Sequence, residues 1–169
     1  MKTNQTKEVV DGRAIMPDWT DWTAEKVDTV GFAHPTSWSP ETDRSDEGTS
    51  VLLQSDAVSF GVVGIYPPEY SPEELTEQVL ESVREEHPGL EVEELATSDR
   101  KYKEGSAFEG LFMTLDTVAY CWVRSWRLRT RTVVVYVQSI QAESADGEEV
   151  FDKICQSVKQ QGAENGGDS

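Results

Sequence analysis

The stretch from Thr117 to Ala142, TVAYCWVRSWRLRTRTVVVYVQSIQA, decides the fold. It contains no aspartate or glutamate over 26 residues, although 32 of the 169 residues in the chain are acidic. Two segments in it, 117–128 and 133–142, are rich in β-branched and aromatic residues, and an arginine-rich turn separates them. Because burying an unpaired carboxylate is costly, central strands avoid acidic residues. The stretch therefore predicts two long neighbouring strands in the middle of a sheet.

Side-chain alternation gives the first of these strands a large face and a small face. The large face carries Tyr120, Trp122, Arg124, Trp126 and Leu128, and the small face carries Ala119, Cys121 and Val123. In one interpretation a helix packs on the small face, a second layer meets the large face, and the arginines that follow form a hairpin tip. In the other, the large face is exposed and binds a partner, because Trp, Tyr and Arg dominate interface hot spots. That second interpretation makes the following residues the candidate binding site: Trp122, Arg124, Trp126, Arg127 and Arg129.

The net charge of the chain, −17, limits the kind of partner that it can bind. Such a charge repels phosphate backbones and anionic lipid headgroups, so we expect binding to neither nucleic acid nor membranes. The arginines of residues 124–131 are an exception to this repulsion of anions, since a planar guanidinium between indoles can bind a carboxylate. The expected partner is therefore an acidic protein. Residues 1–12 lack the apolar core of a secretion signal, so we expect a cytoplasmic protein.

Two helices are expected outside this stretch. Ser71 and Glu74 form a capping box around Pro72, which occupies the first helical position, and the helix ends at His87-Pro88-Gly89. A second helix is expected to begin near Asp146, with Glu149 as its capping partner.

The strands and helices together indicate one α+β domain with a mostly antiparallel sheet flanked by helices. The predicted order is β-β-β-α-β-β-β-β-α, with strands at 29–34, 51–54, 58–66, 90–96, 107–115, 117–128 and 133–142. Residues 41–49 are expected to form a polar loop. We expect an N-terminal extension at 1–26 that is partly flexible, the domain at 27–159, and a disordered tail at 160–169.

Three local phrases resemble the PsbP-like family, which includes the extrinsic photosystem II subunit, a Ran-GTPase release factor and bacterial DcrB-like proteins. They are FAHP at 32–35 followed by Trp38, SPEEL at 71–75, and VFDKICQSV at 150–158. The match spans residues 29–158. The resemblance implies an α/β/α sandwich and a non-enzymatic binding or adaptor domain.

The sequence shows no recognisable pattern for catalysis or metal binding. Neither His34 nor His87 stands in a nucleophile motif, and the two histidines and two cysteines lack chelating spacing. The acidic loop at 43–48 does not follow the calcium-loop pattern. We therefore identify no catalytic residue, no metal site and no cofactor. The alternative to a binding domain is a small enzyme whose site combines scattered acidic residues with His34 and arginine.

Four further residues are expected to be structural. Trp19 and Trp22 would latch the N-terminal segment onto the domain, or else contact a partner. Cys121 and Cys155 lie in apolar segments, so we expect two buried thiols rather than a disulfide.

Overall fold

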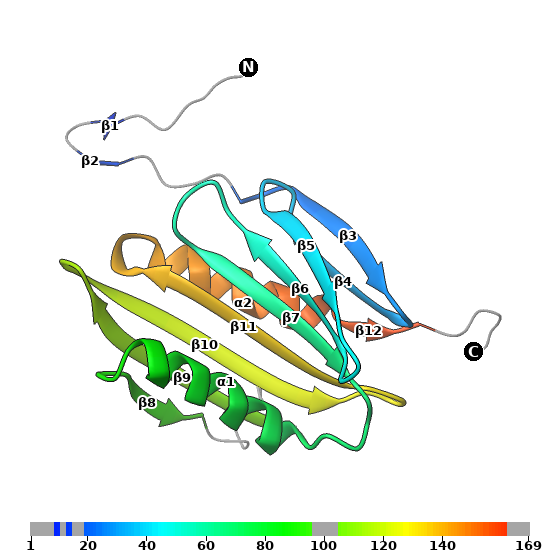
Figure 1. The fold of residues 1–169 in the computed structure, drawn as a ribbon. Helices are drawn as coiled ribbons and strands as arrows, with labels where there is room; N and C mark the ends of the chain where they lie inside the picture. The colour runs from blue at the N-terminus through cyan, green and yellow to red at the C-terminus, as the bar shows by residue number, and fades with distance from the viewer. Residues whose placement is uncertain (1–8, 11–12, 15–18, 96–104, 162–169) are drawn as a thin grey trace.

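The computed structural model describes residues 9–10, 13–14, 19–95 and 105–161, and these form an α+β fold around one large sheet (Figure 1). This sheet has seven strands in the order β5-β6-β7-β11-β10-β9-β8, and every neighbouring pair is antiparallel. The bounds are β5 Ser39–Arg44, β6 Thr49–Gln54, β7 Phe60–Tyr66, β8 Glu91–Glu94, β9 Ser106–Thr114, β10 Thr117–Arg127 and β11 Thr132–Ile140. The predicted central pair, β10 and β11, therefore lies inside the sheet with neighbours on both sides.

A smaller antiparallel sheet has the order β12-β4-β3. Its strands are β3 Trp22–Val27, β4 Val30–Pro35 and β12 Lys159–Gln160. Of the three strands of this small sheet, only β4 was predicted from the sequence, because the residues of β3 were assigned to the extension at 1–26. Gln160 was assigned to the disordered tail, and this was wrong, because Gln160 pairs with Val30. The rest of the predicted extension and tail, residues 1–8, 11–12, 15–18 and 162–169, lies outside the described part. Within the extension, β1 Val9–Val10 pairs with β2 Arg13–Ala14.

The prediction of a polar loop at 41–49 was wrong over its first half. Strand β5 runs along the edge of the large sheet and pairs with β6 from Ser39 to Arg44. All six of its side chains are exposed, so the segment has no apolar face that alternation could reveal.

The two helices lie on opposite faces of the large sheet, as Figure 1 shows with α1 in front and α2 behind. Helix α1, Pro72–Glu86, contacts β9, β10 and β11. Helix α2, Ser144–Ser157, contacts β10 and β11 on the other face and also β4 of the small sheet. Each face has its own apolar core: Leu75 and Leu80 of α1 pack with Cys121 and Val123, whereas Phe151 of α2 belongs to the larger core.

The start of α1 follows the predicted capping box. The backbone N–H of Glu74 donates to Ser71 Oγ at 3.0 Å, and the backbone N–H of Ser71 donates to Glu74 Oε1 at 2.9 Å. The predicted capping of α2 was wrong: the helix begins at Ser144, directly after the 3₁₀ turn η2 Gln141–Glu143. Glu143 occupies the N-cap position without a side-chain capping bond, because its carboxylate accepts a hydrogen bond from Ser59.

A glycine in the first turns of α2 brings the helix close to β11. A Cβ at Gly147 would lie 2.8 Å from Ser139 Cβ and 3.4 Å from Trp122 Cζ3. Ser139 is buried and its hydroxyl bonds to that of Ser59 at 2.9 Å. Because Ser59 donates its own proton to Glu143, Ser139 is the donor to Ser59. The N-cap of α2, strand β11 and the residue that precedes β7 are thus joined by a chain of side-chain hydrogen bonds.

Candidate functional site

The tryptophans of the predicted binding site are buried. Trp122 is 3% exposed and Trp126 is 7% exposed, and both belong to the core between the sheet and α2. The Trp122 ring lies 6.4 Å from that of Phe151 in α2, at an interplanar angle of 30°. The interpretation that this face is exposed and binds a partner is therefore wrong. The apolar stripe of α2 must be buried, and the large face of β10 provides the surface for it.

Arg124, on the same face, is half-buried and makes contacts within the protein. Its guanidinium lies 4.3 Å from the centre of the Trp126 ring, a cation–π geometry. It also lies beside the thiol of Cys155. Burial raises the pKa of Cys155 to about 12, and the positive charge of Arg124 acts in the opposite direction. Arg124 thus stabilises the α2 interface instead of presenting its charge to a partner.

The small face of β10 lies under α1, as the first interpretation predicted. Burial raises the pKa of Cys121 to about 11, although hydrogen bonding with Tyr136 and with the backbone of Gly110 acts in the opposite direction. Both cysteines are free and buried, which confirms the prediction of two thiols without a disulfide. A thiol with such a pKa stays protonated near neutral pH and is a poor nucleophile.

His34, on which the enzyme alternative depended, lies in the interior of the small sheet. It is 2% exposed, with Nε2 at 3.0 Å from Glu25 Oε2 and Nδ1 at 2.8 Å from the carbonyl oxygen of Pro35. Both ring nitrogens are engaged and a substrate has no direct access to them. The structure gives the enzyme alternative no support at this residue.

The N-terminal tryptophans pack on the domain. Trp19 is buried and meets the Trp38 ring edge to face, with the centroids 5.1 Å apart. Trp22 is half-buried against the same core, and the ammonium of Lys153 lies 5.7 Å from its ring. The prediction of a latch is confirmed for both residues.

Arg127 and Arg129 are the two predicted site residues that are exposed. They lie at the end of β10 and in the turn to β11, together with the half-buried Arg131. The turn is tied to the small sheet, because the backbone N–H of Thr130 donates to Gln160 Oε1 at 2.9 Å. This contact brings Lys159 to the same end of the molecule.

Lys26 and Lys159 both pair with Gly31, so their side chains lie on one face of the small sheet, the face opposite to Gln160, at the same end of the molecule as the three arginines (Figure 1). We call this group the basic end: Lys26, Arg127, Arg129, Arg131 and Lys159. Sequence reasoning missed both lysines, since the short strand β12 gives no periodic signal.

The hydrogen bonds of the basic end leave most of its positive charge available. Arg127 Nε donates to the carbonyl oxygen of Pro68 at 3.3 Å, and Arg131 Nη1 donates to that of Thr130 at 2.8 Å. Within residues 19–95 and 105–161, no ion pair of these five cations is found. The nearby carboxylate of Asp28 is paired with Arg44 at 3.6 Å. The basic end is thus a positive surface on an otherwise acidic protein.

Comparison with known proteins identifies no family: neither family models nor curated proteins match the chain. Within the part of the chain that the structure describes, no group of three or more His, Cys, Asp or Glu side chains is placed to hold a metal ion. In the same part, neither helix is long and apolar enough to cross a bilayer.

Proposed function

We propose that the protein is a non-catalytic binding domain that holds an acidic segment of a partner protein at its basic end. One observation carries this proposal: Arg127 and Arg129 are exposed on a chain of net charge −17, in the same hairpin as the half-buried Arg131. Guanidinium groups bind carboxylates through paired, charge-assisted hydrogen bonds. The acidic remainder of the surface repels such a partner, so the partner is directed to this end.

The anchoring of the hairpin turn supports the proposal. The bond from Thr130 to Gln160 holds the turn against the small sheet before any partner arrives. A surface that is ordered in advance loses less conformational entropy on binding than a free loop would. The cost of association is therefore reduced where the arginines lie.

The finer description of the fold that we propose is the PsbP-like α/β/α sandwich. The placement of α1 and α2 on opposite faces of the large sheet supports it. The resemblance implies an adaptor role, which agrees with the proposed binding of an acidic segment. We propose that the protein acts in the cytoplasm.

A short fluorescein-labelled peptide of alternating aspartate and serine tests the proposal by fluorescence anisotropy. The double variant Arg127→Gln/Arg129→Gln should bind it about five- to tenfold more weakly at physiological salt, since each exposed charge contributes up to about 1 kcal/mol. The matched control is Arg84→Gln/Lys153→Gln, which makes the same change in net charge on the two helices. Equal weakening by both double variants, or no binding by the unmodified protein, would contradict the proposal.

A further inference from the structure

Helix α1 covers only part of its face of the large sheet. It contacts β9, β10 and β11, whereas strands β5, β6 and β7 extend beyond it on that side (Figure 1). Between the helix and β7 lies an open cleft with a volume of about 320 Å³. This volume is at the lower end of the range for small-molecule sites, about 300–1,000 Å³.

The walls of the cleft are mostly apolar. They are formed by Phe60 and Val62 of β7, Val134 of β11, and Val79 and Val83 of α1. Of these residues, Phe60, Val62, Val79 and Val83 are only half-buried, so part of their apolar surface is still in contact with water. Placing an apolar group there would remove that surface from water, at about 25 cal/mol per Å².

The polar side chains that line the cleft are those of Ser82, Glu86, His87, Tyr136 and Gln138. The hydroxyl of Tyr136 donates to Gln138 Oε1 at 2.7 Å and also interacts with the thiol of Cys121. Burial raises the pKa of Tyr136, and the charge of Glu86 adds to this effect. The tyrosine is therefore neutral.

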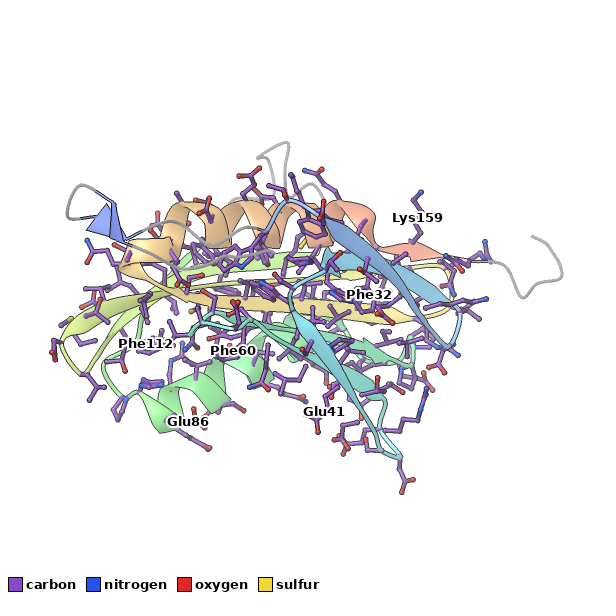
Figure 2. All side chains as sticks on the ribbon, turned by 90° about the horizontal axis from the view of Figure 1, so that it is seen from above. Phe32, Glu41, Phe60, Glu86, Phe112 and Lys159 are labelled. Atoms are coloured by element: carbon purple, nitrogen blue, oxygen red, sulfur yellow. The ribbon has the colours of Figure 1, made fainter. Side chains whose placement is uncertain are left out.

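Two carboxylates lie on this side of the sheet, Glu86 at the cleft and Glu41 two strands away from β7. Glu86 lines the cleft at the end of α1. Glu41 of β5 pairs with Leu52, which pairs with Val62, so Glu41 lies on the same face of the sheet as the apolar floor. Figure 2 shows Glu41 and Glu86 on the same side of the sheet, with Phe60 between them in that view.

We propose that this cleft binds a small organic amine, with the apolar body between α1 and β7 and the ammonium group beside Glu86. The apolar walls and the small volume select a compact aromatic or branched body. The carboxylate of Glu86 favours a positive head group and disfavours a negative one. This site lies on the face of α1 and is separate from the basic end, so its test is independent of the proposed function.

Three ligands distinguish the contribution of the ammonium group from that of the apolar body. They are 4-phenylbutylamine, 4-phenylbutyrate, which lacks the positive charge, and n-butylamine, which lacks the ring. Isothermal titration should give the tightest binding for 4-phenylbutylamine, at least about fivefold tighter than for either of the others. In ¹H–¹⁵N NMR spectra the amine should shift the amide signals of Val62, Val83 and Gln138. Equal affinity for 4-phenylbutyrate, or for n-butylamine, would overturn the proposal, as would shifts confined to other residues.

The substitution Glu86→Lys tests the rim directly. Glu86 is exposed in the last turn of α1, where a positive charge interacts favourably with the helix dipole, so the variant should fold. It should bind 4-phenylbutylamine about tenfold more weakly and 4-phenylbutyrate more tightly than the unmodified protein. The control Glu85→Lys makes the same charge change at the neighbouring exposed position, which does not line the cleft. If both variants changed the preference between 4-phenylbutylamine and 4-phenylbutyrate equally, the assignment of Glu86 as the residue that binds the ammonium group would be overturned.

Discussion

Replacing Gly147 by alanine should destabilise the protein, although helix propensity alone gives the opposite sign. In an exposed helix interior the change from glycine to alanine stabilises by about 1 kcal/mol. Here the new Cβ would lie 2.8 Å from Ser139 Cβ, well inside the distance of about 3.5–4.0 Å that carbon atoms prefer. Rotation of the serine hydroxyl cannot relieve a contact with Cβ, so α2 must move away from β11.

The magnitude follows from the two effects that oppose the gain in propensity. Inserting a methyl group into a well-packed core costs about 1–3 kcal/mol. A movement of α2 also weakens the buried bond between Ser139 and Ser59, which contributes about 1 kcal/mol. The expected net loss in the free energy of unfolding is about 1–3 kcal/mol. For a chain of this length that lowers Tm by about 2–4 °C for each kcal/mol.

Urea unfolding followed by tryptophan fluorescence and far-UV circular dichroism measures this change. The control Gly89→Ala has open space around the new Cβ and should leave the stability unchanged or raise it by up to about 1 kcal/mol. Adding Ser139→Gly to Gly147→Ala removes the opposing Cβ, so a double-mutant cycle should show favourable coupling. A Gly147→Ala variant as stable as the unmodified protein, or a cycle without coupling, would refute the reasoning.

Further predictions concern the core, the first helix and the thiols. Trp122→Ala should lower the free energy of unfolding by about 3–5 kcal/mol, as measured by urea denaturation, because the ring is buried against α2. A change below 1 kcal/mol would contradict its place in the core. Ser71→Ala should cost about 0.5–2 kcal/mol in the same assay through loss of the N-cap bond, and unchanged stability would mean that the bond contributes nothing. Cys121 and Cys155 should react with a thiol reagent at pH 8 only after unfolding, and fast labelling of the folded protein would contradict their burial. Since both pKa values are higher in the folded state than the ordinary value of 9.0, the unfolded chain loses these protons first, and stability should fall as pH rises above about 9.

The parts of the fold that local sequence determines were predictable. The capping box at Ser71 and Glu74 places the start of α1, because all its groups lie within one turn of the helix. The pair β10 and β11 was predictable because both strands are long and apolar and are joined by a short polar turn.

The parts that depend on distant contacts were not predictable. All six side chains of strand β5 are exposed and β12 has only two residues, so neither carries a periodic signal. The two faces of β10 could be separated by alternation, but whether the face of Trp122 meets α2 or solvent depends on how a helix some thirty residues later docks. Lys159 lies at the same end of the molecule as Arg129 because β12 pairs with β4 and Gln160 bonds to the hairpin turn, and no local pattern indicates either contact.

The composition of the two outer strands of the large sheet has a consequence for the behaviour of the protein at high concentration. Edge strands present unpaired backbone groups that can join the edge strand of another molecule. Here one edge, β5, carries Pro40, Glu41 and Asp43, and the other edge, β8, carries three glutamates in four residues. Two copies that approached edge to edge would bring mostly carboxylates together, because Arg44 is the one basic residue of these two strands, and the proline would leave one backbone position without a donor. The acidity of the chain thus also prevents sheets from growing between molecules, and this protection should weaken below about pH 4, where carboxylates become protonated.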